Sequence, residues 1–121
     1  MRRGELWWVE RPRQKRRQYL ILSRSRVVDA LSAVIAVPMT STVRSIPTEV
    51  KLRPGDGMPK GCALNLDNLD LVKKIHFRER ICTLAPVRLE QVCAALAVAV
   101  DAPADYRARR LGRRRKIAAD G

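Results

Sequence analysis

Aromatic residues and long apolar runs are scarce in this sequence. Only 4% of its 121 residues are aromatic although 46% are hydrophobic, so a core has to be built mainly from leucine, valine, isoleucine and alanine. The longest apolar run, residues 94–100, is far shorter than the roughly 20 residues of a membrane-spanning helix. The first residues also lack the apolar stretch of a signal peptide. We therefore expect a soluble, unexported protein with no membrane partner.

Cysteine and histidine are scarce as well. The three cysteines, Cys62, Cys82 and Cys93, are odd in number and show no CxxC spacing, which argues against a disulfide framework and against a zinc site. We expect free thiols in a reducing cytoplasm, and neither a metal nor a cofactor. His76 is the only histidine, so an acid–base mechanism that uses two histidines is excluded within one chain.

Acidic residues are few compared with basic ones. The chain has 25 lysines and arginines and 12 acids, which gives a formal net charge of +13. Residues 1–26 hold nine basic residues and two acids, and residues 104–121 hold seven and two, so the segment between them is nearly neutral. Two basic ends favour a polyanionic partner, with nucleic acid ahead of a membrane surface. A charged surface that only keeps the protein in solution is the alternative.

The hydrophobic pattern of the sequence predicts mainly short strands. Residues 32–39 are continuously apolar, which indicates a strand buried on both faces, and the alternation around Glu49 and Lys51 indicates a strand with one wet face. Trp7 and Trp8 should point to opposite faces of the first strand. Short strands without long helices between them favour a small antiparallel barrel or sandwich. The predicted strands cover residues 4–10, 18–23, 32–39, 47–52, 62–66, 69–74 and 79–84.

One helix is predicted near the C-terminal end. Pro86 suits a first helical turn, and apolar residues then recur at three- and four-residue spacing. Residues 24–31 fit either a loop or one helical turn. We expect one domain over residues 1–102 and, because of its like-charge run, a disordered basic tail over 103–121. The predicted apolar stripe of the helix consists of Leu89, Val92, Cys93, Leu96 and Val100.

Five segments occur in an order that a known family shares. They are RRGELWWVE (2–10), RRQYLILS (16–23), VPMTSTVRSIPTEVKL (37–52), GCALNLDNLDLV (61–72) and RICTLAPVRLEQVCAALAVAV (80–100). Over roughly residues 2–100 the chain resembles the MazF/PemK family of type II toxin ribonucleases. The resemblance implies an SH3-like small antiparallel barrel with a C-terminal helix, the fold of the CcdB and MazF toxins.

The same resemblance implies an activity and its partners. Members of the family act as homodimers that cut single-stranded RNA at short sequences, without a metal, and leave a 2′,3′-cyclic phosphate and a 5′-hydroxyl. An acidic MazE-like antitoxin tail inhibits them. For this chain we expect RNA as the substrate, with mRNA, tRNA and rRNA all open.

Two residues are expected to form the catalytic pair. The arginine that starts the family's second strand corresponds to Arg17, and the threonine after its third strand corresponds to Thr40. Attack by a neighbouring 2′-hydroxyl needs charge stabilisation at phosphorus, and a guanidinium supplies it with a planar fork of donors. Arginine stays protonated near neutral pH, so Arg17 is expected to stabilise charge and not to act as the general base. Thr40 is expected to position the phosphate.

Further residues are expected to contact the substrate. Ser41 and Thr42 share the turn with Thr40, and Arg44 adds positive potential beyond it. Gln18 stands where the family usually has proline. Asp67 and Asn68 correspond to an acidic-amide dipeptide of the family. Hydroxyl residues also satisfy backbone groups in turns, which is the alternative for this segment. The expected contacts are Gln18, Ser41, Thr42, Arg44, Asp67 and Asn68.

Departures from the family keep other readings open. The loop at residues 11–17 lacks the family's Gly-Ser-Glu-Gln-like stretch, so the sequence does not identify which residue is the general base. Glu10 is either a proton acceptor or a partner in an ion pair. Two rival functions are a non-catalytic nucleic-acid-binding module of SH3-like fold and a CcdB-like inhibitor of DNA gyrase.

Overall fold

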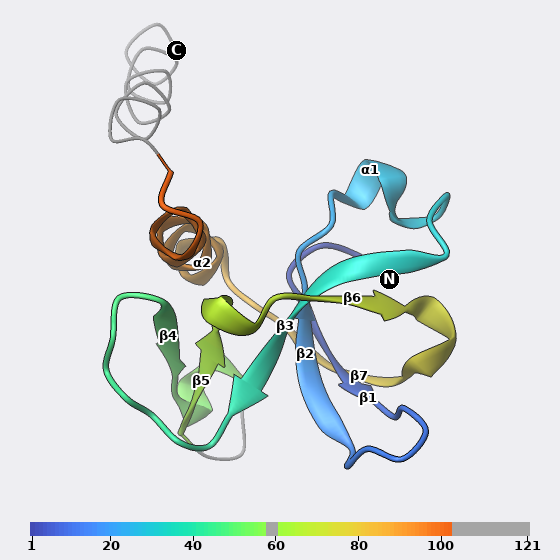
Figure 1. Ribbon diagram of the computed structural model, residues 1–121, viewed down its shortest axis with the longest axis horizontal. Helices are drawn as coiled ribbons and strands as arrows, with labels where there is room; N and C mark the ends of the chain where they lie inside the picture. The colour runs from blue at the N-terminus through green and yellow to red at the C-terminus, as the bar shows by residue number, and fades with distance from the viewer. Residues whose placement is uncertain (58–60, 103–121) are drawn as a thin grey trace, which may run out of the picture.

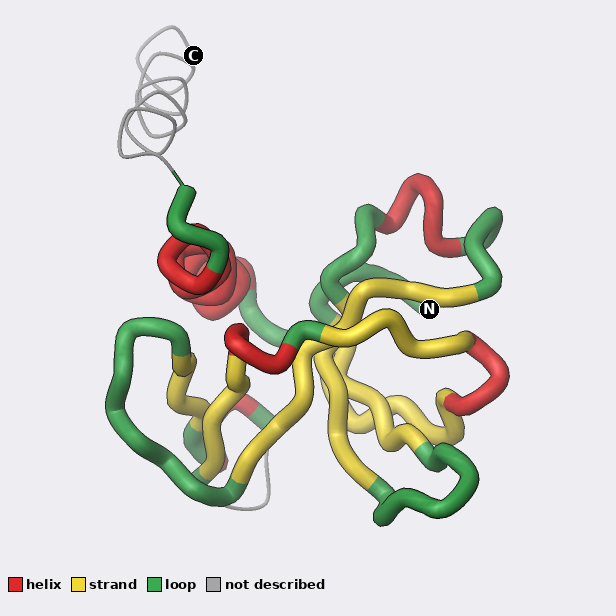
Figure 2. The backbone as a smooth tube through the Cα atoms, in the orientation of Figure 1, coloured by secondary structure: helices red, strands yellow, loops and turns green. Residues whose placement is uncertain are grey.

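The computed structural model describes residues 1–57 and 61–102, so the predicted tail at 103–121 lies outside the described residues. A bent antiparallel sheet carries one longer helix on one side (Figures 1 and 2). The strands are β1 (Glu5–Val9), β2 (Arg17–Ile21), β3 (Ala33–Thr40), β4 (Glu49–Leu52), β5 (Cys62–Asn65), β6 (Asp70–Lys73) and β7 (Phe77–Thr83). The helices are α1 (Ser25–Val28), α2 (Pro86–Ala99) and the 3₁₀ turns η1 (Pro54–Asp56), η2 (Leu66–Asn68) and η3 (Lys74–His76).

The long strand β3 organises the sheet. The strand order is β4-β5-β3-β2-β1-β7, and β6 pairs with the first half of β3 while β5 pairs with its end. All of these pairs are antiparallel. In Figure 1, β3 runs through the centre of the molecule between the β4–β5 hairpin and the other strands. Pairing with β2, β5 and β6 therefore fixes the position of β3 in the sheet.

Hydrophobic clusters cover both faces of the central strands. Leu20 and its partner Val37 lie in the first cluster, which α2 and the β4–β5 hairpin cover, whereas Ile21 and its partner Ala36 lie in the second. Alternation of side chains sends successive residues to opposite faces. The prediction that this strand is buried on both faces is confirmed over most of its length; Ile35, at 47% exposure, is the exception.

The helix α2 closes the first cluster. Val92 and Ala95 are buried, Leu89 and Leu96 pack against the cluster, and the helix contacts β4 and η2. Of the predicted stripe, Leu89, Val92 and Leu96 lie in or against this cluster, Cys93 is half-buried outside it, and Val100, which follows the last helical residue, is 61% exposed. Within residues 1–57 and 61–102 no helix is long and apolar enough to cross a membrane.

The fold class is confirmed, with one difference. All seven predicted strands are present with ends within two residues of those expected, and the ambiguous segment 24–31 contains one helical turn. The sheet does not close into a barrel, because in the described residues it begins at β4 and ends at β7 without pairing between them. None of the three cysteines forms a disulfide; Cys62 is buried, and burial, with the charge of Asp56, raises the pKa of half-buried Cys82.

Asp56 links the turn η1 to α2. Its Oδ2 accepts a hydrogen bond of 2.8 Å from the Arg53 amide, and its Oδ1 accepts one of 3.0 Å from Arg88 Nε. The Arg53 amide first, and Arg88 second, hold the pKa of Asp56 below its ordinary value. This carboxylate therefore stabilises the fold above the unfolded-state pKa of about 3.9, and its contribution is lost as the pH falls through the lower folded-state pKa.

The variant Asp56→Asn tests this link. We expect it to lower the free energy of unfolding by about 0.5–1 kcal/mol at pH 7, because a charged acceptor becomes neutral. The difference from the unchanged protein should shrink below about pH 4. Urea unfolding at several pH values measures it, with exposed Asp29→Asn as the control. A deficit that does not change with pH would show that the carboxylate charge is not involved.

Candidate functional site

Two neighbouring strand ends bring Arg17 and Thr40 together. Arg17 is the first residue of β2 and Thr40 is the last residue of β3. The two strands pair Tyr19 with Pro38, and the same register, continued by two residues, sets Arg17 across from Thr40. Residues directly opposite each other in an antiparallel pair have Cβ atoms about 5 Å apart. The guanidinium and the hydroxyl therefore start from adjacent positions.

The neighbouring row of side chains shows which face this pair occupies. Met39 pairs with Leu64, and Leu64 pairs with Val50; all three are buried in the first cluster. Because successive side chains point to opposite faces, Thr40 points away from that cluster. The pair thus stands on the face that the helix α2 does not cover.

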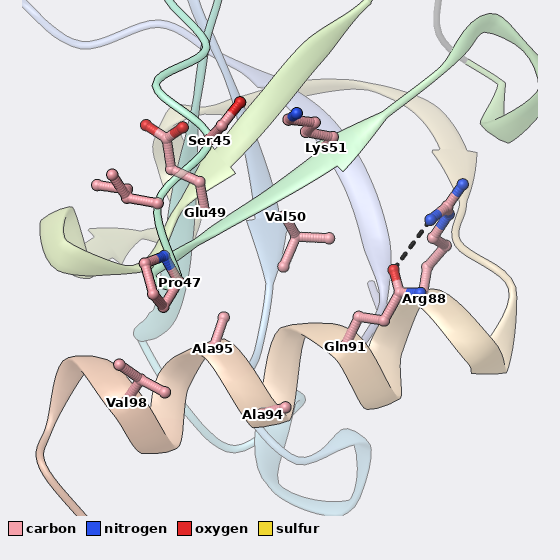
Figure 3. A pocket seen from close by; sticks show the side chains of 11 residues that line it. Ser45, Pro47, Glu49, Val50, Lys51, Arg88, Gln91, Ala94, Ala95 and Val98 are labelled. Carbon is pink, nitrogen blue, oxygen red and sulfur yellow. Dashed lines mark hydrogen bonds between the residues drawn. The ribbon is translucent and has the colours of Figure 1, made fainter.

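Four residues form a row across the sheet on this face. Thr40 pairs with Ala63, and Ala63 pairs with Lys51, so Arg17, Thr40, Ala63 and Lys51 follow one another across β2, β3, β5 and β4. We call these four residues the rim row. Arg17 and Lys51 are exposed, Thr40 is half-buried and Ala63 is fully buried. Figure 3 shows Val50 and Lys51 leaving β4 in opposite directions, with Val50 toward α2.

The guanidinium of Arg17 is held at the end of β3. Its Nε donates a hydrogen bond of 3.2 Å to the carbonyl oxygen of Met39, the residue before Thr40. This bond orients the guanidinium plane while the side chain stays exposed to solvent. A guanidinium has five N–H donors, so this arrangement leaves donors for the oxygens of a bound phosphate.

The hydroxyl of Thr40 takes part in the turn. It accepts a hydrogen bond of 3.1 Å from the Thr42 amide, and it lies 3.5 Å from the Thr42 carbonyl oxygen. The first contact is the backbone role that hydroxyl residues often have in turns. The second is at the long limit for a hydrogen bond, so the hydroxyl hydrogen can be donated to a ligand at little cost.

Hydrogen bonds hold the middle and the end of the loop at residues 41–48 to β4 and to the turn η2. The Arg44 amide donates a hydrogen bond of 2.8 Å to Glu49 Oε1, and Arg44 Nε lies 3.4 Å from Glu49 Oε2. At the other end, Thr48 donates a hydrogen bond of 2.6 Å to Asp67 Oδ2. Ser41 and Thr42 remain exposed beside Thr40.

Glu49 differs from the expectation for the wet face of its strand. Its side chain is only 1% exposed, because Arg44 folds back over it. Alternation along the strand predicted the correct face, but it could not show that a residue five positions earlier covers the carboxylate. Lys51, two residues later on the same face, is exposed as expected.

The structure does not bring every expected contact to Arg17 and Thr40. Gln18 pairs with Trp8 and occupies the opposite face from Arg17. Asp67 lies beyond the end of β5, in η2, where its amide donates to the Asn65 side chain. Asn68 is exposed in the same turn.

The basic loop between β1 and β2 packs on acidic and aromatic residues. The Arg16 guanidinium lies 4.1 Å from the centre of the Trp8 ring, and it forms ion pairs with Glu10 at 3.6 Å and Glu79 at 3.4 Å. Of the two predicted roles for Glu10, the structure shows the ion pair. Trp7 packs edge-on against Phe77 of the second cluster, so it is the tryptophan nearer to the core.

A groove of about 500 Å³ runs beside the outer strand β4 (Figure 3). The helix α2 forms one wall, and the end of the 41–48 loop forms another. Glu49, Val50 and Lys51 of β4 also line the groove. Sequence reasoning did not single out Lys51 as a site residue, because only the strand pairing aligns it with Thr40.

Comparisons with known proteins identify relatives of this chain. A family model described as PemK-like, MazF-like toxin of type II toxin–antitoxin system matches residues 2–100. The chain is 39% identical to the probable endoribonuclease MazF5 of Mycobacterium tuberculosis, over 82% of this chain and 92% of that protein. It is 38% identical to the probable endoribonuclease MazF2 of the same species, over 79% and 94%.

Solved structures show the same fold. One is an endoribonuclease in complex with its cognate antitoxin from a mycobacterial species, with a TM-score of 0.77 and 26% identity over 85% of this chain and 97% of that chain. Another is the Mycobacterium tuberculosis toxin MazF-mt6, with a TM-score of 0.74 and 26% identity over 80% and 96%.

Proposed function

This chain belongs to the PemK-like, MazF-like toxin family of type II toxin–antitoxin systems, and from this premise we propose that it is an endoribonuclease that cleaves single-stranded RNA. Relatives that it matches along most of their length carry the name endoribonuclease. The observation that carries the proposal is the adjacency of Arg17 and Thr40 on a solvent-accessible face. The strand register supports this placement, because the neighbouring row of side chains, which contains Met39, points into the first cluster.

The proposed reaction needs no external nucleophile. The 2′-hydroxyl of the nucleotide before the cut loses its proton as its oxygen attacks the adjacent phosphorus, and the bond from phosphorus to the 5′-oxygen breaks. The products are a 2′,3′-cyclic phosphate and a 5′-hydroxyl, which receives a proton. Positioning for in-line attack and stabilisation of charge on the phosphate are therefore the main tasks of the protein.

Arg17 and Thr40 are proposed to share these tasks. Arg17 donates two hydrogen bonds to phosphate oxygens, where negative charge grows in the transition state. Thr40 donates its hydroxyl hydrogen to the same phosphate and holds it against the strand end. The exposed residues Ser41 and Thr42 stand beside this position, and beyond it the charge of Arg44 is paired with that of Glu49.

A protein partner follows from the same premise. The mycobacterial neighbour was solved with its cognate antitoxin, and we propose that an acidic antitoxin also binds this strongly basic chain. We further propose that the chain acts as a homodimer in the cytoplasm, where mRNA, tRNA and rRNA are all available as substrates.

The activity is tested by mapping cleavage of a long RNA of defined sequence. We expect discrete cuts in the presence of EDTA, at a short shared sequence, with 5′-hydroxyl ends on the downstream products. Primer extension locates the cuts, and the ability of kinase to label the new ends without prior phosphatase treatment identifies the hydroxyl. Salt-sensitive binding of RNA without any cleavage would instead identify a binding module and refute the enzyme.

A further inference from the structure

We propose that Lys51 binds a phosphate of the RNA next to the one that is cut. The inference rests on the proposed function, because it assigns a second phosphate position to the same site. It adds a cation from β4, a strand that contributes neither Arg17 nor Thr40. The rim row then binds the RNA backbone at two points across the sheet.

The strand register provides the geometry. Thr40 pairs with Ala63, and Ala63 pairs with Lys51, so these three residues lie on one line across three strands. Neighbouring strands are about 4.8 Å apart, which places the backbones at Thr40 and Lys51 about 10 Å apart. A lysine side chain at that distance reaches a neighbouring phosphate more readily than the phosphate held by Arg17 and Thr40. Ala63, which lies between them in this row, is small and fully buried.

The charges around Lys51 leave its ammonium group free for a ligand. Glu49 is the nearest acid on the same face of β4, but its carboxylate is buried and faces Arg44 at 3.4 Å. Within residues 1–57 and 61–102, the side chain of Lys51 makes no hydrogen bond and no ion pair, although it is exposed. The ammonium of a lysine is a compact point charge that binds phosphate well.

The position of Lys51 on an outer strand suggests a second role that has to be separated from this one. Charged side chains, lysine above all, prevent outer strands from pairing with other molecules. That role predicts that loss of the charge promotes aggregation and leaves RNA binding unchanged. A phosphate contact predicts weaker binding with no change in the state of association.

The experiment compares Lys51→Met with Lys73→Met in the full-length chain. Lys73 is also an exposed lysine on a strand, but it lies on β6, where it pairs with Ala33 and not with the rim row. Both variants lose one positive charge, so the effect of net charge is the same in the two. KM and kcat are measured with an RNA that the unchanged protein cleaves, and light scattering reports association.

We expect Lys51→Met to raise KM by about threefold to tenfold with kcat within about twofold, because the contact is equally present before and during the reaction. The salt dependence of RNA binding, measured with a 2′-deoxy nucleotide at the cut, should decrease by about 0.7 in log–log slope, the value for one phosphate contact on a single strand. Lys73→Met should show neither change.

A chemical probe identifies the phosphate. One phosphate at a time on either side of the cut is replaced with an uncharged methylphosphonate. At one position, the substitution should weaken binding to the unchanged protein by the same factor as Lys51→Met, and the variant should lose nothing further there. Additive losses at every position would overturn the proposal.

The outcomes separate the two levels of inference. Failure of the unchanged protein to cleave RNA would overturn the proposed function. Cleavage with KM and salt slope equal in Lys51→Met and Lys73→Met would overturn only the role of Lys51. Aggregation of Lys51→Met with unchanged KM would assign the residue to protection of the outer strand instead.

Discussion

Replacing Arg17 with alanine is expected to lower kcat for RNA cleavage by about 10²- to 10³-fold, the usual cost of removing one preorganised donor at a developing negative charge. The guanidinium is held beside Thr40 by its bond to the Met39 carbonyl, so its position does not depend on substrate. RNA binding should weaken only in part, because other cations on this face remain. Single-turnover cleavage and binding to a 2′-deoxy substrate measure the two effects separately.

A matched variant distinguishes geometry from charge at this position. Arg17→Lys keeps the positive charge but loses the planar fork, so we expect it to recover binding and only a small part of kcat. Arg17 is exposed, and neither change removes buried surface, so the unfolding transition should stay within about 0.5 kcal/mol of the unchanged protein. Cleavage by Arg17→Ala at the original rate would remove this residue from the mechanism.

Replacing Leu64 with alanine is expected to lower the free energy of unfolding by about 3 kcal/mol, within the range of 2–5 for such changes in a core. Leu64 is fully buried and lies between Met39 and Val50, with which it pairs across β3 and β4. The change leaves a cavity beneath the strands that carry the rim row. A loss of this size is a large part of the 5–15 kcal/mol that stabilises a typical domain.

Leu71→Ala serves as the control for this prediction. Leu71 lies on β6 and is 65% exposed, so the same deletion of atoms should cost about 0.5 kcal/mol or less. Urea unfolding of both variants, followed by circular dichroism, gives the two values. Equal losses would mean that the packing around Leu64 is not as the structure describes it.

The sequence predicted the elements of the fold well because their patterns are local. The apolar segment that became β3, the alternation around Val50 and the spacing of Leu89, Val92 and Leu96 each depend on nearby residues. The open sheet was not predicted, because closure depends on whether β4 and β7 meet, and no short segment contains that information.

The sequence indicated only part of the site geometry, because pairing between distant strands decides which residues lie side by side. Arg17 and Thr40 followed from a resemblance, and the register of β2 and β3 now places them opposite each other. Gln18 was assigned because it stands where the family usually has proline; it pairs with Trp8, and as the neighbour of Arg17 on β2 it points to the opposite face. Lys51 is 11 residues from Thr40 along the chain, and only the intervening strand β5 aligns the two, so sequence reasoning had no means to connect them.

The pairing of β3 also bears on how this chain is made. Thr40 is aligned by Ala63, which follows it by 23 residues, and Glu5 of β1 pairs with Thr83 near the end of the sheet. Contacts between residues this far apart form late, because the chain between them has to be closed first. During synthesis on a ribosome, Arg17 and Thr40 emerge before β5, which pairs with the end of β3, and before β7, which pairs with β1. The complete sheet around Arg17 and Thr40 therefore forms only when most of the chain has been translated.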